Sequence, residues 1–405
     1  MNSDHTSEPI GDASHRKRFA SLLFLCLVAA FCLRIVVAAT QPYLWDEEHN
    51  AIPLANSISF SSSHPNLPIR GQHHPALPSY IVKASSALFG HSPLGYRALH
   101  VVAGLIGILL IWHLTRLASG DQAALWAAAL LAFNEYDVGV SSFATAKGPH
   151  LIFMIGSIYA FGRFLLTPRA AWLYAAAAAV GLAFYAKEHA LLALPVFAGV
   201  LLQSKYRHWF RSPHLYGSLA VVVIVIAPDV LWNLAKPDPE QAGYGDQFSR
   251  IGGLGLNGYP FLFFAHHAIR WVYEAVTGSV LADGVAENPS MNVVLGPLLF
   301  GLVVASTFRK KGFSTLRPFL LSLFWFVFIF FVSLRPGRPT LELDPVAWYW
   351  TDVVLFPAVI LSGSRLANTT GRWGIVLKVL AVIGMVTAVV RTAFWWPFVD
   401  EDLAP

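Results

Sequence analysis

The sequence contains few charged residues and many hydrophobic ones. Of its 405 residues, 13% are charged and 56% are hydrophobic. Apolar runs of about 17 to 22 residues recur along the whole chain, which excludes a soluble globular protein and predicts an all-α polytopic membrane protein. The net charge of +5 lies mostly in short loops, where it orients a membrane protein and does not indicate nucleic-acid binding.

Cysteine is also scarce. Cys26 and Cys32 both fall in the first apolar run, and their separation corresponds to a helical rise of about 9 Å, too far for a disulfide. No cysteine metal site, glycine-rich phosphate loop or Ser-His-Asp arrangement is present. The pair His266-His267 and the single His64 do not show metal-ligand spacing with a carboxylate. We therefore predict no obligatory metal or other cofactor, although Asp46 and Glu48 together could hold a divalent ion.

The apolar runs predict about eleven transmembrane helices in a single domain, 1–405. The predicted spans are 19–40, 94–116, 121–137, 148–166, 170–186, 188–203, 213–235, 290–308, 315–334, 346–364 and 373–395. Every short loop on one side is basic. The other side receives most of the acidic residues, including Glu135 with Asp137, and the pair Lys187-Glu188. The positive-inside rule then places residues 1–18 in the cytoplasm and the acidic loops outside, with the first span kept as an anchor.

Two exterior loops are too long to be simple turns. In the first, 41–93, apolar residues recur at helical spacing from Ala76 to Phe89, which predicts an amphipathic helix in the membrane interface. The second, 236–289, is rich in glycine and then in aromatic residues. Long loops of this kind are usually functional, so both are expected to border the site.

Three consecutive carboxylates, Asp46, Glu47 and Glu48, open the first exterior loop. Charges at a membrane boundary are costly unless they have a function. A carboxylate at the membrane surface can act as the base that takes the proton of an acceptor hydroxyl, and Asp46 at a span end is the best candidate. Glu47 is a candidate catalytic contact and Glu48 a candidate substrate contact. The alternative is that these acids cap the helix expected near His49.

The order of these features resembles a known family. One span, an acidic pair, the turn His74-Pro75 with an aromatic helix, and then Tyr96-Arg97 are similar to the membrane glycosyltransferases of the protein O-mannosyltransferase and aminoarabinose transferase type. The segments 181–187 and 333–338 resemble later parts of that family. The resemblance implies a GT-C fold and an enzyme that takes a sugar from a polyprenyl-phosphate carrier. Where the family often has an arginine and an acid near the fourth span, this chain has Lys147.

A departing phosphate needs cations, and basic residues at exterior span ends are the candidates. The predicted phosphate or donor ligands are His74, Arg97, Lys187, Arg335 and Arg338, of which His74 takes the place of a lysine in some relatives. Further candidate substrate contacts are His73, Lys147 and Tyr349. The alternative for each cation is a side chain that extends to the lipid headgroups.

The sequence thus predicts an inverting hexosyl- or pentosyltransferase that acts on a glycan, lipid or protein acceptor. The resemblance implies a bacterial inner (plasma) membrane protein with its site on the periplasmic side. Two alternatives stay open. A lipid-linked glycan polymerase or ligase would more readily use a large late loop, and a secondary transporter would place ionisable residues at mid-span, whereas the charges here lie at span ends.

Overall fold

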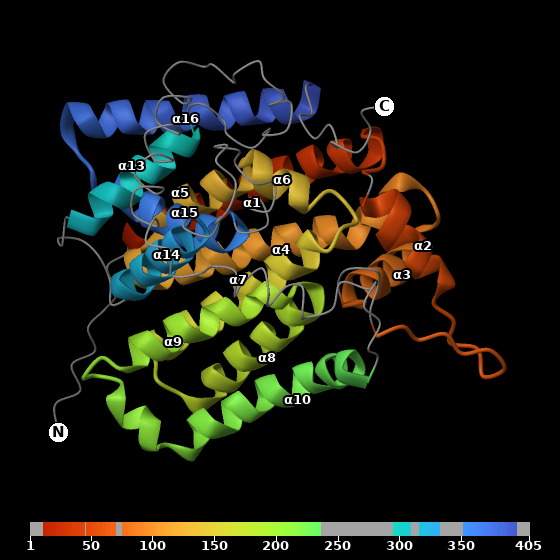
Figure 1. The fold of residues 1–405 in the computed structure, drawn as a ribbon. Coiled ribbons are helices and arrows are strands. Elements are labelled where there is room, and N and C mark those ends of the chain that lie inside the picture. The colour runs from red at the N-terminus through yellow and green to blue at the C-terminus, as the bar shows by residue number, and fades with distance from the viewer. Residues whose placement is uncertain are drawn as a thin grey trace, which may run out of the picture.

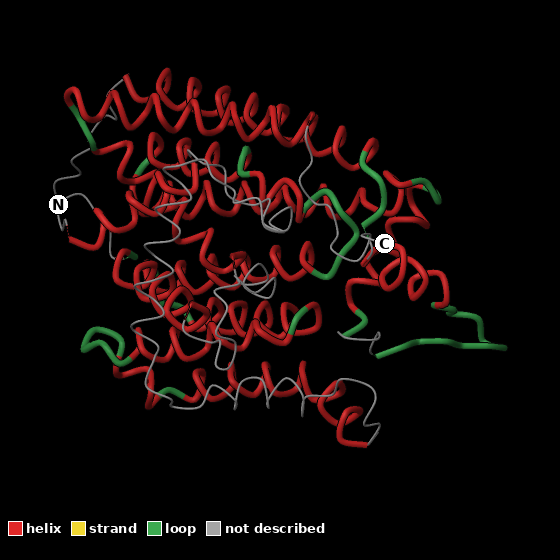
Figure 2. Tube along the Cα trace, turned by 45° about the horizontal axis from the view of Figure 1, so that its top comes forward, coloured by secondary structure: helices red, strands yellow, loops and turns green. Residues whose placement is uncertain are grey.

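The computed structural model describes residues 11–44, 46–69, 75–235, 295–308, 316–332 and 351–394. In these ranges the chain is helical, apart from connecting loops and an isolated bridge between Ser59 and Asn66. Figure 2 shows helices running through the whole bundle, with the loop that contains this bridge projecting at one side. The predicted all-α class is confirmed.

Each predicted span contains a helix. These helices are α1 (Gly11–Thr40), α4 (Pro93–Ser119), α5 (Asp121–Ala132), α7 (Lys147–Leu166), α8 (Ala170–Ala186), α9 (Ala193–Leu201), α10 (Pro213–Ala235), α13 (Leu295–Phe308), α14 (Arg317–Val332), α15 (Thr351–Asn368) and α16 (Gly371–Phe394). Five helices in the described part of the chain are long and apolar enough to cross a membrane: α1, α4, α7, α10 and α16. The chain is thus an integral membrane protein. The predicted number of eleven spans is not confirmed, because the other described helices are shorter than a full membrane crossing.

Two predicted spans are shorter than expected. α5 ends at Ala132, and Asn134 caps a separate short helix, α6 (Glu135–Val140), by accepting a hydrogen bond from the backbone N–H of Asp137 at 3.2 Å. The sixth span consists of a 3₁₀ segment, η2 (Glu188–Leu192), followed by the nine residues of α9. A helix of that length rises only about 14 Å, less than half of a bilayer core.

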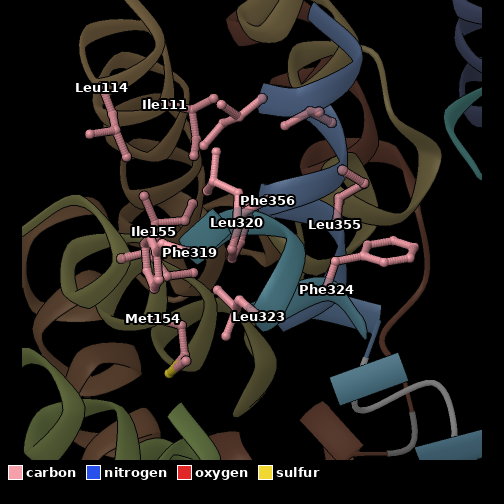
Figure 3. Packing of buried hydrophobic residues seen from close by; sticks show 14 of the residues in the cluster. Ile111, Leu114, Met154, Ile155, Phe319, Leu320, Leu323, Phe324, Leu355 and Phe356 are labelled. Carbon is pink, nitrogen blue, oxygen red and sulfur yellow. The ribbon is translucent and has the colours of Figure 1, made fainter. Parts of the chain in front are cut away.

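The core lies where α4, α7, α14 and α15 meet (Figure 3). Ile111 of α4 and Ile155 of α7 are buried there against Phe319 of α14 and Phe356 of α15. α15 also packs closely on α5 at Gly363. A Cβ atom at this position would lie only 2.7 Å from the carbonyl oxygen of Ala123, so the contact requires glycine. Small residues that let helix backbones approach are typical of membrane bundles.

The two ends of the bundle carry different charges. At one end the last turns of α4 and α15 meet through Ser119 and Ser364, whose hydroxyls are 2.9 Å apart. The arginines Arg116, Arg163 and Arg365 lie in the last turns of their helices at this end. The acidic segment lies at the other end, beside α2 (Ile52–Ser57) and α3 (Leu77–Phe89), which lie at the right of Figure 1. The structure therefore separates the basic loops from the acidic segment, as the charges predicted.

α3 is the amphipathic helix predicted in the first loop. Its serine-bearing face packs on α4, where the Ser85 hydroxyl donates to the carbonyl oxygen of Gly95 at 2.6 Å. Leu88 and Phe89 are exposed instead. An apolar face turned away from the protein is the arrangement expected of a helix that lies in the membrane interface.

Candidate active site

A buried ion pair fixes the acidic segment. Glu47 begins a short π-helix, η1 (Glu47–Ala51), and its two carboxylate oxygens accept hydrogen bonds from Arg97 Nε at 2.8 Å and Nη2 at 2.6 Å. Neither side chain is exposed to solvent. The backbone N–H of Leu44 donates to the same carboxylate at 2.9 Å, and that of Ala144 donates at 2.6 Å. Glu47 thus ties together three segments that are far apart in the sequence.

Every N–H donor of Arg97 has an acceptor. Besides Glu47, its guanidinium donates to backbone carbonyl oxygens at the end of α1: Ala38 (3.0 Å), Gln41 (2.9 Å) and Pro42 (2.7 Å). The guanidinium carbon also lies 4.7 Å from the centre of the Phe143 ring. Because five N–H donors are all that a guanidinium has, this geometry makes Arg97 an anchor of the first loop.

Asp46 is held beside this anchor. It precedes η1 without capping it, and its carboxylate accepts a hydrogen bond from Asn50 Nδ2 at 2.9 Å. The side chain is half-buried, whereas that of Glu48 is exposed. The three carboxylates therefore differ: Glu47 is an anchor, Glu48 faces outward and Asp46 lies between these two environments. The helix expected near His49 is confirmed, but Asp46 and Glu47 do not cap it.

Two lysines lie near Asp46. Lys187 follows the last residue of α8, and Lys147 begins α7. His150 in the first turn of α7 makes a 3.3 Å hydrogen bond to the carbonyl oxygen of Ala183 in the last turn of α8, which brings the two helix ends together. The charges of Lys147, Asp46 and Glu188 all act on Lys187.

Lys187 is almost completely buried, with 2% of its surface exposed. Burial lowers the pKa of its ammonium well below the usual value, and the positive charge of Lys147 lowers it further. Asp46 and Glu188 act in the opposite direction without reversing the effect. A buried lysine with a strongly lowered pKa, close to other charged groups, is typical of a functional site.

An apolar cavity of about 370 Å³ lies on the same side of the bundle. It is bounded by the first exterior loop, α3, α8 and α10. Its lining residues are Leu67, Pro68, Ile69, Ala76, Leu77, Tyr80, Tyr185 and Pro228. Tyr185 in the cavity wall precedes Lys187 by two residues, so the cavity lies at the same end of α8 as this lysine.

Two buried charges, Arg34 and Asp229, were not predicted from the sequence, and Asp137 was predicted to be exterior but is buried. Arg34 lies inside α1, forms an ion pair with Asp137 of α6, and donates from Nε to the Ser141 hydroxyl at 2.8 Å. Asp229 lies inside α10, buried, and close enough to Tyr185 to interact electrostatically. The expectation that charges lie only at span ends is therefore wrong. An arginine within an apolar run was the available signal, since such a charge needs a buried partner.

The other predicted site residues lie outside the described part of the chain. They are His73, His74, Arg335, Arg338 and Tyr349, together with the long loop 236–289. Among the described residues, no three His, Cys, Asp or Glu side chains are grouped as metal ligands. The roles of all these residues, and the absence of a metal, stay predictions.

The chain resembles known proteins in sequence and in structure. Residues 73–232 match the family model of dolichyl-phosphate-mannose-protein mannosyltransferase, which is less than half of the chain. No significant match was found among curated protein sequences.

Two solved structures share the fold. ArnT from Cupriavidus metallidurans, bound to undecaprenyl phosphate, superposes with a TM-score of 0.63 at 18% identity over 89% of this chain. The oligosaccharyltransferase AglB from Archaeoglobus fulgidus, in complex with an inhibitory peptide and a dolichol-phosphate, superposes with a TM-score of 0.54 at 14% identity over 94% of this chain. The chain spans 62% of the length of ArnT and 56% of that of AglB. The predicted resemblance is confirmed, and the chain has the GT-C fold of these membrane enzymes.

Proposed function

We propose that the protein is a glycosyltransferase that moves a sugar from a polyprenyl-phosphate carrier to an acceptor hydroxyl. The observation that carries this proposal is the grouping of Asp46 with Lys147 and Lys187 at one end of a GT-C bundle. A carboxylate and two cations are the groups that this reaction requires. The positive-inside pattern supports placing this end on the exterior face of the membrane, and we propose a bacterial inner membrane.

In the proposed step, Asp46 takes the proton of the acceptor hydroxyl. The hydroxyl oxygen then attacks the anomeric carbon, on the face opposite the carrier phosphate. The bond between the anomeric carbon and the phosphate oxygen breaks, and its electron pair leaves with the phosphate. One such displacement inverts the configuration at the anomeric carbon. Asp46 suits this role because, unlike Glu47, its carboxylate is not enclosed by an arginine and backbone donors.

Lys187 and Lys147 are assigned to the carrier phosphate. Because Lys147 disfavours the charged form of Lys187, an anion between the two ammonium groups would relieve their repulsion. That relief increases as negative charge builds on the leaving phosphate, so it favours the transition state over the bound donor. We propose that Arg335, Arg338 and His74 complete this clamp. Since Arg97 has no free donor, we assign it, with Glu47, to holding Asp46 in place.

The cavity beside Tyr185 is assigned to the first isoprene units of the carrier. Its apolar lining suits a hydrocarbon, and it lies at the same end of α8 as Lys187, where the phosphate would bind. ArnT was solved with undecaprenyl phosphate and AglB with a dolichol-phosphate, which supports a carrier of this class. The acceptor is a glycan, lipid or protein, and the sugar is a hexose or a pentose.

Deletion of the gene tests the proposal. Mass spectrometry of lipid extracts and surface glycans should show one polyprenyl-phosphate sugar accumulating and one sugar missing from the envelope. The wild-type gene should restore both. Identical lipid and glycan profiles in the deleted, restored and parental strains would contradict the proposal.

A further inference from the structure

Aromatic and basic side chains form a connected cluster at the end of the bundle opposite Asp46. Arg163 of α7 lies over the ring of Trp172 in α8, 4.9 Å from its centre. Tyr159 packs edge-on against the same ring, with centres 6.0 Å apart, and its hydroxyl lies 2.9 Å from His113 Nδ1 in α4. Trp112 and Arg116 extend the group along α4, with the guanidinium 5.2 Å from the indole centre. We call these six residues the far-end cluster.

Its hydrogen bonds join two helices. Arg163 Nη1 donates to the Tyr159 hydroxyl oxygen at 3.4 Å. The same hydroxyl forms a 2.9 Å hydrogen bond with His113 Nδ1. Tyr159 thus links the Arg163 guanidinium of α7 to the His113 ring of α4.

Two donors in the cluster are buried without an acceptor. Arg163 Nε and Trp112 Nε1 are shielded from solvent and have no hydrogen-bond partner in the described structure. A buried donor without a partner is destabilising, so a side-chain rotation that brought either N–H to an external acceptor would be favourable. This distinguishes Arg163 from an arginine that merely extends into water.

The positive charge of the cluster is only partly neutralised. Arg116 pairs with Asp121 at 2.6 Å, but in the described residues Arg163 has no carboxylate partner. An anion is therefore the ligand that the electrostatics favour.

The side of α4 that carries His113 is apolar and exposed. Ile106, Leu109 and Leu117 are each more than two fifths exposed, and they share one helix face with His113 because they are spaced three or four residues apart. In a membrane protein such a stripe faces lipid. Arg163 lies sixteen residues beyond Lys147 on α7, a rise of about 24 Å, so the cluster lies near the opposite membrane surface from the active site.

We propose that the far-end cluster binds the phosphate group of an anionic phospholipid in the leaflet opposite the transfer site. The phosphate would pair with the partly exposed guanidinium of Arg163, and the acyl chains would lie along the exposed stripe of α4. Basic pockets between transmembrane helices bind phospholipid headgroups in this way.

The test uses the full-length protein in nanodiscs of phosphatidylcholine, with or without phosphatidylglycerol. We expect phosphatidylglycerol to raise the thermal unfolding midpoint of the wild type and to remain bound in native mass spectra. Arg163→Gln should lower the retained phosphatidylglycerol roughly tenfold, since it removes a charge-assisted hydrogen bond. Arg169→Gln is the matched control, because it removes the same charge from the adjacent loop, and it should behave like the wild type.

Three results would overturn the proposal. The first is equal stability of the wild type in the two lipid mixtures. The second is loss of bound lipid in Arg169→Gln to the same extent as in Arg163→Gln. The third is stabilisation by inorganic phosphate in pure phosphatidylcholine, which would assign the site to a soluble anion. If Arg163→Gln fails to fold, Trp172→Leu supplies a second variant, which should also lose bound phosphatidylglycerol.

Discussion

Arg97 binds both carboxylate oxygens of Glu47, through Nε at 2.8 Å and Nη2 at 2.6 Å, with neither side chain exposed. This pair joins α4 to the loop that carries Asp46, and through Ala144 it also reaches the segment that precedes Lys147. The active-site geometry proposed here therefore depends on an ion pair that does not itself touch substrate.

Glu47→Gln should destabilise the protein by about 3–5 kcal/mol, because it leaves the Arg97 charge buried without a counter-charge. Thermal unfolding in detergent would measure the loss. Glu48→Gln removes the neighbouring exposed carboxylate and should leave the unfolding midpoint close to that of the wild type. Equal midpoints for Glu47→Gln and the wild type would contradict the anchoring role.

Replacing both partners of the buried pair Arg34–Asp137 should cost less stability than replacing one of them. Asp137→Asn leaves Arg34 without its carboxylate, and we expect a loss of about 3–5 kcal/mol. The double variant Arg34→Met with Asp137→Leu removes both charges and should recover much of that stability. Thermal unfolding of the three proteins provides the comparison. A double variant no more stable than Asp137→Asn would show that the pair has another structural role.

Lys187 should set the basic limb of the pH profile. Burial lowers the pKa of its ammonium, so the charged form that binds phosphate is lost as pH rises through that lowered value. The kcat/KM of the wild type should therefore fall at a pH well below the ordinary pKa of lysine. In Lys187→Arg the guanidinium stays charged, so any remaining activity should persist to higher pH.

Lys205→Arg is the control for this experiment, because Lys205 is exposed at the other end of the bundle. Its pH profile should match that of the wild type. A basic limb that does not move in Lys187→Arg would remove Lys187 from the phosphate site.

Thiol labelling would test the orientation of the bundle. In a chain with Cys26 and Cys32 replaced by serine, Ser62→Cys in the first loop should react with an impermeant reagent applied to intact cells. Ser204→Cys, which is exposed at the opposite end, should not react. The reverse pattern would move the proposed site to the cytoplasm.

The fold class and the acidic end of the bundle could be predicted because they depend on local patterns. Apolar runs predicted helices, and the spacing from Ala76 to Phe89 predicted α3, which the structure confirms as Leu77–Phe89. The roles of the three adjacent acids could not be separated in this way. Glu47 differs from Asp46 only through Arg97 and Ala144, which are 50 and 97 residues away in the chain.

The shortened spans have a similar explanation. Hydropathy averaged over a long window does not locate a helix end to within a few residues, so the break at Asn134 fell inside the predicted span 121–137. Arg34 was visible in the sequence, but its partner was not, because Asp137 lies 103 residues away and had been counted among the exterior charges. Long-range pairing of this kind depends on how the helices pack.

Donor turnover by Asp46→Asn is the most direct test of Asp46 as the base of the proposed sugar transfer. Purified wild type, Asp46→Asn and the control Glu48→Gln would be placed in nanodiscs with the polyprenyl-phosphate sugar and acceptor identified from the deletion strain, and released polyprenyl phosphate would be measured by mass spectrometry. We predict turnover by the wild type and Glu48→Gln, and a loss of about two to four orders of magnitude in Asp46→Asn at an unchanged unfolding midpoint. Near-normal release of polyprenyl phosphate by Asp46→Asn, or none by the wild type, would contradict the account.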